Sequence, residues 1–353
     1  MSKHLMTLAD FLVEQLKKTD HAPALAVLLL TIADTAKEIA SITAKGALTE
    51  FTGKLDSQNV QGETQMQLDV LTNEVYIRVL SACGVVAGLA SEEMDAPIAI
   101  TAGGKFLVLF DPLDGSSNVP VNVAVGSIFS VLNAPKHVPD DTDYLQAGSQ
   151  QVAAGYALYG PCTMLVLTVG EGTHGFTLDN DKGAFLLTHF NMQIPETTAE
   201  FAINASNARF WDAPVQRYIE NCQAGKTGPR GKDFNMRWVA SMVVDIHRIL
   251  IRGGVYLYPK DNKQPFKEGR LRLLYEVNPM SMLVEQAGGY SSTGRQRMLD
   301  VVPSQVHQRI AVLIGSIHEV HLLEHYYQDF DAGISNKGQS PLFGDRSLYN
   351  KKQ

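Results

Sequence analysis

An apolar run that stops abruptly at a pair of carboxylates limits how this chain of 353 residues can fold. Residues 106–110 read Phe-Leu-Val-Leu-Phe, and Asp111 and Asp114 follow in the segment DPLDGSSN. A short, fully apolar run is typical of a strand that is buried on both faces of a sheet. The segment therefore predicts a central strand whose end carries two carboxylates.

The segments on either side of this strand predict a mixed α/β fold. Leucines at positions 5, 8, 12 and 16 recur at three- and four-residue spacings, as one buried helix face requires. The same periodicity predicts helices at residues 25–39, 68–80 and 238–250, and the pair Asn278-Pro279 predicts the start of another. Short apolar runs predict further strands at residues 153–158, 164–169, 255–258 and 271–276.

A polar stretch at residues 191–200 marks the predicted boundary between two lobes. On this division, residues 1–198 form an N-terminal lobe, residues 199–330 form an α/β C-terminal lobe, and residues 331–353 form a polar tail. A chain of this length has room for about two domains of ordinary size.

The composition excludes some classes of partner. Lys and Arg number 30 against 37 Asp and Glu, a net charge of −7, which lacks the basic surplus that a nucleic-acid-binding face needs. The apolar run at residues 22–33 is shorter than the roughly 20 residues that cross a bilayer. The cysteines Cys83, Cys162 and Cys222 form no CxxC pair. We therefore expect a cytoplasmic protein that binds neither nucleic acid nor membranes.

The carboxylates at the strand end favour metal-assisted phosphate chemistry. Gly115, Ser116 and Ser117 follow them directly, and backbone N–H groups in such a loop can point at an anion. Mg²⁺ prefers carboxylate oxygens and shares them with substrate phosphates. A simple turn after a strand is an equal alternative for this segment alone. The pair Glu92-Glu93 and the strand-end residue Glu276 add carboxylates, and together they favour a multi-metal phosphoryl-transfer site.

A set of segments in fixed order adds a family resemblance. The segments are VAGLASEE, KFLVLFDPLDGSSN, AAGYALYG, MRWVASMVVDIHR, GGVYLYP, GRLRLLYEVNPM and EQAGG. From about residue 8 to 330 the chain resembles the class I fructose-1,6-bisphosphatases. The resemblance implies a layered αβαβα sugar-phosphatase fold with two mixed β-sheets and flanking helices, and a homotetramer. It also implies Mg²⁺-dependent hydrolysis of the 1-phosphate of fructose 1,6-bisphosphate, and Mn²⁺ can take the same oxygen ligands.

The resemblance also assigns roles to residues. It implies metal ligation by Glu63, Glu92, Asp111, Asp114, Glu276 and the backbone carbonyl of Leu113. Asp69 and Glu93 look like the carboxylates that activate and orient the attacking water. The implied substrate contacts are Asp114, Gly115, Ser116, Ser117, Asn204, Arg237, Met242, Tyr258, Arg270 and Arg272. Arg237 is expected to reach in from a neighbouring subunit. The family's allosteric region and the metal-site carboxylates fall in the N-terminal lobe.

Departures from the family pattern affect specificity and regulation. Arg270 stands where the family usually has Lys, and Trp238 and Asn207 stand where it often has Tyr. Sedoheptulose 1,7-bisphosphatase or dual-specificity activity is therefore an open alternative. Residues 22–26 read APALA in place of the family's AMP-binding TGELT segment, so we expect weak or absent AMP inhibition. A non-catalytic sugar-phosphate-binding regulator and an inositol-phosphate hydrolase are further alternatives, which the retained carboxylates and the arginine segments respectively disfavour.

Overall fold

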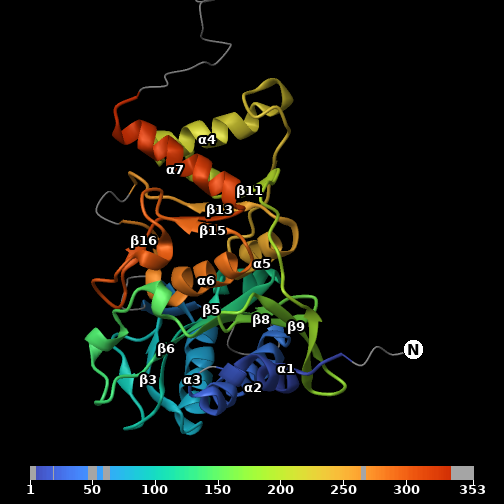
Figure 1. Cartoon of the computed structure of the whole chain (residues 1–353), viewed down its shortest axis with the longest axis vertical. Coiled ribbons are helices and arrows are strands. Elements are labelled where there is room, and N and C mark those ends of the chain that lie inside the picture. Colours follow the sequence, from blue (N-terminus) through green and yellow to red (C-terminus); the bar gives the residue numbers. More distant parts are fainter. Residues whose placement is uncertain (1–4, 19, 47–53, 59–63, 264–267, 335–353) are drawn as a thin grey trace, which may run out of the picture.

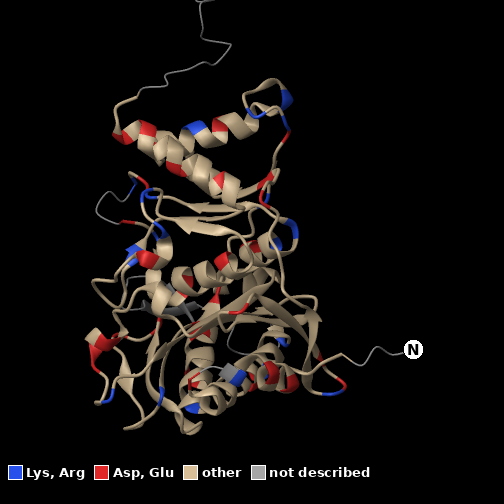
Figure 2. Ribbon diagram, viewed as in Figure 1, with Lys and Arg blue, Asp and Glu red and all other residues tan. Residues whose placement is uncertain are grey.

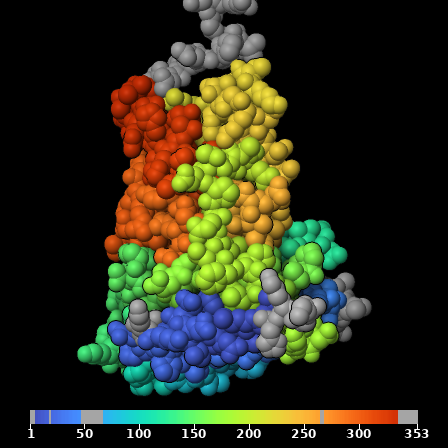
Figure 3. Space-filling view, turned by 45° about the vertical axis from the view of Figure 1, so that its right-hand side comes forward, coloured from blue at the N-terminus to red at the C-terminus, as the bar shows by residue number. Residues whose placement is uncertain are grey.

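In a computed structural model the chain folds into five stacked layers (Figure 1). The structure describes residues 5–18, 20–46, 54–58, 64–263 and 268–334. Helices α1–α3 cover one face of a large sheet, helices α5 and α6 separate it from a smaller sheet, and helices α4 and α7 cover the far side. Figure 3 shows the same order from another side, with the N-terminal helices at one end and α4 and α7 at the other. The expected αβαβα fold with two mixed sheets is confirmed.

The large sheet has eight strands in the order β10-β9-β8-β7-β6-β5-β3-β4. Their bounds are β3 Val86–Ser91, β4 Ile98–Ala99, β5 Phe106–Asp114, β6 Val125–Asn133, β7 Ala153–Tyr159, β8 Thr163–Thr168, β9 His174–Asp179 and β10 Ala184–His189. Strand β5 pairs in parallel with β3 and antiparallel with β6. All nine residues of β5 are buried, so the predicted central strand is confirmed.

The small sheet has five strands in the order β12-β11-β13-β17-β15. Their bounds are β11 Glu200–Ile203, β12 Asn235–Met236, β13 Val255–Tyr258, β15 Tyr290–Ser292 and β17 Val312–Gly315. Two short pairs complete the strands: β1 (Lys54–Gln58) with β2 (Thr64–Met66), and β14 (Leu271–Arg272) with β16 (Arg309–Ile310).

Apolar helix faces supply the cores between these layers. The helices are α1 Leu8–Gln15, α2 Ala22–Thr43, α3 Gln67–Ala82, α4 Ala213–Gln223, α5 Met242–Arg252, α6 Asn278–Gln286 and α7 Ile317–Asp331. The N-terminal helices bury their leucines against the large sheet, and the ring of Tyr76 stacks on Phe110 of β5 at 4.6 Å. Val243 and Ile246 of α5 join Leu283 of α6 in the core between the sheets. This packing fixes the end of β5 against the middle helices.

The structure corrects two of the element predictions and adds a buried strand. Residues 271–276 form only the short strand β14, and Leu273–Val277 form a π-helical turn, η8, that leads into α6. A short buried apolar run carries no periodicity that separates strand from helix, which explains the error. Helix α5 begins at Met242 instead of residue 238, because the Ser241 side chain caps it and Ala240 has a positive φ of 65°. The buried strand β3 was not predicted.

Charged residues of both signs are interspersed along the helices and loops (Figure 2). Among the described residues, no helix is both long and apolar enough to cross a lipid bilayer.

Candidate active site

Three carboxylates, which we call the carboxylate triad, lie together where β5 meets η8. Asp111 and Asp114 stand at the end of β5, and Glu276 lies in the η8 turn. One carboxylate oxygen from each residue lies within 4.8 Å of the other two. All three residues are buried, with relative exposures of 5%, 7% and 5%. The structure thus brings together three of the predicted metal-site residues from separate parts of the chain.

The triad concentrates negative charge that the chain itself does not fully offset. Burial raises the pKa of Asp111 well above its ordinary value, and nearby negative charges, first that of Glu92, raise it further. Burial also raises the pKa of Asp114 to about 6, and it raises the pKa of Glu276 well above its ordinary value. A bound divalent cation would oppose both causes, and Mg²⁺ and Mn²⁺ prefer oxygen donors of this kind. The donor set therefore fits a divalent metal.

The start of helix α5 holds one member of the triad in place. Ser241 Oγ donates to Asp114 Oδ2 at 2.6 Å, and Val243 N donates to the same oxygen at 2.8 Å. Gly115 has a φ of +76°, and a Cβ there would lie 2.7 Å from Ser241 Cβ. Only glycine fits both conditions without strain. The sequence analysis missed Ser241, although a Ser before an amphipathic helix is a recognisable N-cap signal.

Glu92 lies beside the triad, but its closest described partner is an arginine. Glu92 follows β3, and Arg272 Nη2 lies 3.0 Å from Glu92 Oε1 with both side chains largely buried. The backbone N–H of Arg272 donates to Glu276 Oε2 at 2.7 Å. Arg272 is therefore the cation that this chain places at the edge of the triad. The sequence analysis assigned Glu92 to metal and Arg272 to substrate, and the structure places the two in contact.

The carboxylates predicted to activate water occupy two neighbouring segments. Asp69 lies buried in the first turn of α3, where Ser116 Oγ donates to Asp69 Oδ2 at 3.3 Å. Ser116 and Ser117 begin the short helix η3 (Ser116–Val121), so α3 contacts the loop that follows β5. Glu93 is half-buried, and its backbone N–H donates to Ser91 Oγ at 3.2 Å. Glu63 lies outside the described residues.

Several predicted substrate contacts lie on helix α5 and on segments of the small sheet and its connections. Met242 is the buried first residue of α5. Asn204 caps the short helix η6 (Ala205–Phe210), with its Oδ1 accepting from Ser206 N at 3.2 Å. Tyr258 ends β13, and its ring centroid lies 5.8 Å from that of Trp238. These residues come from different elements, and Met242 also contacts the triad, because its backbone N–H hydrogen-bonds to Asp114.

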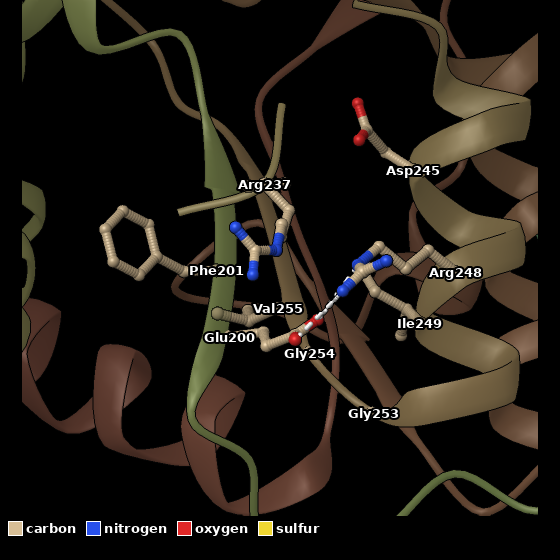
Figure 4. A pocket seen from close by; sticks show the side chains of 10 residues that line it. Glu200, Phe201, Arg237, Asp245, Arg248, Ile249, Gly253, Gly254 and Val255 are labelled. Carbon is tan, nitrogen blue, oxygen red and sulfur yellow. Dashed lines mark hydrogen bonds and ion pairs between the residues drawn. The ribbon is translucent and has the colours of Figure 1, made fainter. Parts of the chain in front are cut away.

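The two other predicted phosphate ligands lie apart from each other. Arg237 is exposed and lines a hollow between β11, β13 and α5, beside Arg248, which makes two hydrogen bonds of 2.9 Å with Glu200 (Figure 4). The lining of this hollow does not include the triad. Arg270 pairs instead with Asp261, a residue that the sequence analysis did not identify.

Comparison with known proteins places both halves of the chain in one family. Residues 6–190 match the model of the fructose-1-6-bisphosphatase N-terminal domain, and residues 194–328 match that of its C-terminal domain. A relative from Methylacidiphilum infernorum named fructose-1,6-bisphosphatase class 1 is 52% identical over 99% of both chains. One of the same name from Hydrogenophilus thermoluteolus is 55% identical over 98% of both.

The fold comparison agrees with the sequence comparison. The crystal structure of Leishmania major fructose-1,6-bisphosphatase in its holo form superposes with a TM-score of 0.85 at 36% identity. The match covers 92% of this chain and 99% of the Leishmania chain. With the family models matched in both halves and the layered fold in common, this chain belongs to the class I fructose-1,6-bisphosphatases.

Proposed function

We propose that this chain hydrolyses the 1-phosphate of fructose 1,6-bisphosphate, giving fructose 6-phosphate and phosphate. The observation that carries the proposal is the carboxylate triad, three buried acidic groups whose oxygens lie within 4.8 Å of one another. Buried like charges destabilise a fold unless a cation offsets them. A cluster of three buried carboxylates therefore indicates a site that binds a cation. Two relatives at 52% and 55% identity carry the name of this activity, which supports the choice of substrate.

The triad is proposed to hold Mg²⁺ or Mn²⁺, together with Glu92 and the backbone carbonyl of Leu113. When bound, such ions lower the pKa of the attacking water and offset the charge that develops on the leaving sugar oxygen. The chain prepares this donor set through α5, whose Ser241 and Val243 orient the Asp114 carboxylate. The further ligand that the family resemblance implies, Glu63, lies outside the described residues.

Other groups of the chain are proposed to act directly on water and on phosphate. Asp69 accepts a proton from the attacking water, and Glu93 orients that water molecule. The water oxygen then forms a bond to phosphorus while the bond from phosphorus to the sugar oxygen breaks. The contact between Asp69 and Ser116 supports this role, because it places a carboxylate beside the loop that follows β5. The N–H groups of Gly115, Ser116 and Ser117 bind the 1-phosphate oxygens. No covalent phospho-enzyme is needed.

The far end of the substrate is proposed to meet cationic and hydrogen-bonding groups. Asn204, Tyr258 and Arg270 contact the 6-phosphate and the sugar, and Met242 lies beside the sugar. Arg237 is proposed to reach a neighbouring subunit's site within a homotetramer. Two observations support this. Arg237 is exposed, and the residue before it, Met236, is 46% exposed although it is apolar.

A longer sugar bisphosphate is a second candidate substrate. Trp238 stacks on Tyr256, with ring centroids 5.6 Å apart and an interplanar angle of 13°. An indole at this position offers an apolar wall without the hydroxyl that a Tyr would bring to a phosphate. Selection against sedoheptulose 1,7-bisphosphate is therefore proposed to be weaker than in relatives that have Tyr here.

One assay tests the function and separates the alternatives. Phosphate release is measured in Mg²⁺ buffer with fructose 1,6-bisphosphate, sedoheptulose 1,7-bisphosphate and inositol 1-phosphate in parallel. We expect release from the first, with the second deciding dual specificity, and none from the third. Release from none of the three would refute the enzyme and favour the sugar-phosphate-binding regulator.

Weak AMP inhibition is proposed from the start of α2. Residues 22–26, Ala-Pro-Ala-Leu-Ala, carry no side-chain hydrogen-bond donor, and Pro23 also lacks a backbone N–H in the first turn. This helix start offers few of the donors that an AMP phosphate would require. AMP titration at saturating Mg²⁺ should change the rate less than about twofold, since a weak anion site contributes little. Strong inhibition at micromolar AMP would contradict the proposal.

A further inference from the structure

Asp261 is a buried carboxylate whose role the proposed reaction leaves unassigned. It follows β13, is 6% exposed, and lies outside the carboxylate triad. Its Oδ2 accepts from Arg270 Nε at 3.1 Å, and Arg270 Nη2 lies 3.1 Å from the same oxygen. A buried acid that faces one edge of a guanidinium constrains the orientation of the whole group.

The chain holds Asp261 from several directions. Its Oδ1 accepts from Lys263 N at 3.1 Å, and its backbone forms an antiparallel bridge with Trp211. The next residue, Asn262, donates its N–H to Phe210 O at 2.9 Å. These contacts fix the position of Asp261 relative to the segment between η6 and α4. The Asp261 carboxylate in turn constrains the orientation of the Arg270 guanidinium.

Arg270 is also tied through its backbone to the edge of the triad. Its carbonyl oxygen accepts from Arg309 Nη1 at 2.7 Å and from Arg272 Nη1 at 3.3 Å. Arg272 in turn pairs with Glu92. Only Leu271 thus separates Arg272, beside the proposed metal site, from Arg270, whose side chain is still 27% exposed. A guanidinium with a fixed direction loses less conformational entropy when it binds the second phosphate of a bisphosphate ligand.

Guanidinium geometry explains why this position suits Arg and not Lys. Arginine carries five N–H donors in a rigid, planar fork, so an acid can occupy one edge while an anion binds the other. In this chain Asp261 faces the Nε and Nη2 edge, and the donors of Nη1 point away from it. Lysine is a single point charge, and the buried acid would hold it as an ion pair.

We propose that Asp261 is a positioning residue that aims Arg270 at the far phosphate of the sugar bisphosphate. The inference rests on the proposed function and adds a specificity element to it. Asp261 and Arg270 form one unit, in which the acid takes one edge of the guanidinium and the substrate phosphate takes the other. The Arg at this position and the buried Asp therefore depend on each other.

A double-mutant cycle tests this dependence. KM and kcat are measured for wild type, R270K, D261N and the double variant R270K/D261N, with fructose 1,6-bisphosphate and with fructose 1-phosphate, which lacks the far phosphate. E268Q is the matched control, because Glu268 makes an exposed ion pair with Lys260 in the same loop region, at 2.7 Å. Thermal unfolding of each variant reports whether it is folded.

We expect R270K to raise KM for the bisphosphate at least about tenfold, as loss of a charge-assisted hydrogen bond implies. D261N should raise it several-fold, and kcat should stay within about twofold for both. The double variant should have a lower KM than R270K alone, since its Lys is no longer held by an acid. KM for fructose 1-phosphate should not change in any variant, and E268Q should match wild type.

Different results identify different failures. Additive effects in the cycle, or equal effects on both substrates, would overturn the positioning role. If D261N does not fold, D261E decides instead, because Glu keeps the acid but displaces its oxygens by one methylene: an unchanged KM for the bisphosphate overturns the proposal, and a rise confined to the bisphosphate supports it. A wild-type protein that releases no phosphate from fructose 1,6-bisphosphate refutes the proposed function instead.

Discussion

Two regions of this molecule bury carboxylates, and they do so in opposite ways. At the end of β5, Asp111, Asp114 and Glu276 face one another. Between α4 and α7, Glu319 is 2% exposed and lies 2.7 and 2.8 Å from the same nitrogen of Arg230, Nη2. The Tyr218 hydroxyl donates to Glu319 as well, at 2.6 Å. One region gathers like charges and the other pairs opposite charges.

The difference separates a site from a structural clamp. A buried acid that has an arginine and a hydroxyl is satisfied within the fold, and removing its partner leaves an uncompensated charge. Buried acids that have mainly one another raise each other's pKa, which a fold tolerates best when a cation from outside joins them. Burial alone therefore does not indicate function, but the identity of the nearest charges does. The predictions below test this distinction.

The largest effect is expected at the triad. Asp114→Asn removes one charge while keeping the hydrogen-bond acceptor for Ser241, so the fold should persist and the metal-free protein should become no less stable. Turnover should fall by at least about 1000-fold, the factor that corresponds to several kcal/mol of lost transition-state stabilisation. Steady-state kinetics at saturating Mg²⁺ and urea unfolding measure the two effects.

Asp34→Asn is the control for that variant, because Asp34 is exposed on α2 and pairs with its neighbour Lys37 in an i, i+3 contact. It should leave turnover and stability at their wild-type values. Retained turnover in Asp114→Asn would show that the triad does not act in the reaction.

The opposite outcome is expected at the clamp. Glu319→Gln should lower the free energy of unfolding by about 3–5 kcal/mol, because it leaves the largely buried Arg230 without its counter-charge. Turnover of the folded protein should stay close to wild type. Glu196→Gln is the control, since the Glu196 side chain makes an exposed contact with His318 at 3.8 Å. A loss of turnover without loss of stability would place Glu319 in a functional role.

Divalent metal should separate the two regions directly. A cation that binds only the folded protein adds about 2.7 kcal/mol of stability at 100 times its Kd. We expect Mg²⁺ or Mn²⁺ to raise the Tm of wild type and of Glu319→Gln by similar amounts, and to raise that of Asp114→Asn much less. Differential scanning calorimetry with and without metal measures this. Equal shifts in all three proteins would place the bound metal elsewhere.

Much of the fold could be predicted from local patterns, and the failures have physical causes. The strand at 106–110 and the strand at 255–258 were predicted correctly because apolar runs with sharp polar ends carry their own signal. The strand predicted at 271–276 was wrong beyond Arg272, because a buried run before Asn278-Pro279 also suits a helical turn. Only packing between layers decides between them.

The residues of the site likewise divide into those that could be predicted from the sequence and those that could not. Asp111 and Asp114 could be predicted from a strand end, and the family resemblance pointed to them and to Glu276, whose own predicted strand end proved to be a helical turn. Ser241 and Asp261 could not, because their roles arise from contacts made by the folded chain. Ser241 and Asp114 are 127 residues apart in sequence. Asp261 is only nine residues from Arg270, but nothing in the intervening sequence requires the two side chains to meet.

A third kind of buried ionisable group gives the smallest predicted effect. His247 of α5 faces neither a like charge nor a counter-charge at hydrogen-bonding distance: its Nδ1 lies 2.7 Å from the Tyr156 hydroxyl. Burial, together with a smaller effect of the charge of His189, lowers the pKa of His247 to about 4. The folded state therefore favours neutral imidazole. Its contribution to stability is complete above pH 6.5 and is lost as the pH falls from 6.5 toward 4.

His247→Gln keeps a hydrogen-bonding side chain without this titration. Between pH 7.5 and 5.0, metal-free wild type should lose about 1–2 kcal/mol relative to the variant in urea unfolding, allowing for partial exposure of the ring. The triad contributes with the opposite sign, because raised carboxyl pKa values favour the folded state as the pH falls, and the comparison at each pH cancels that term. His318→Gln, at an exposed histidine, should track wild type. If His247→Gln instead follows the wild-type pH dependence, burial does not keep the imidazole neutral, and only charge pairing distinguishes the buried groups of this fold.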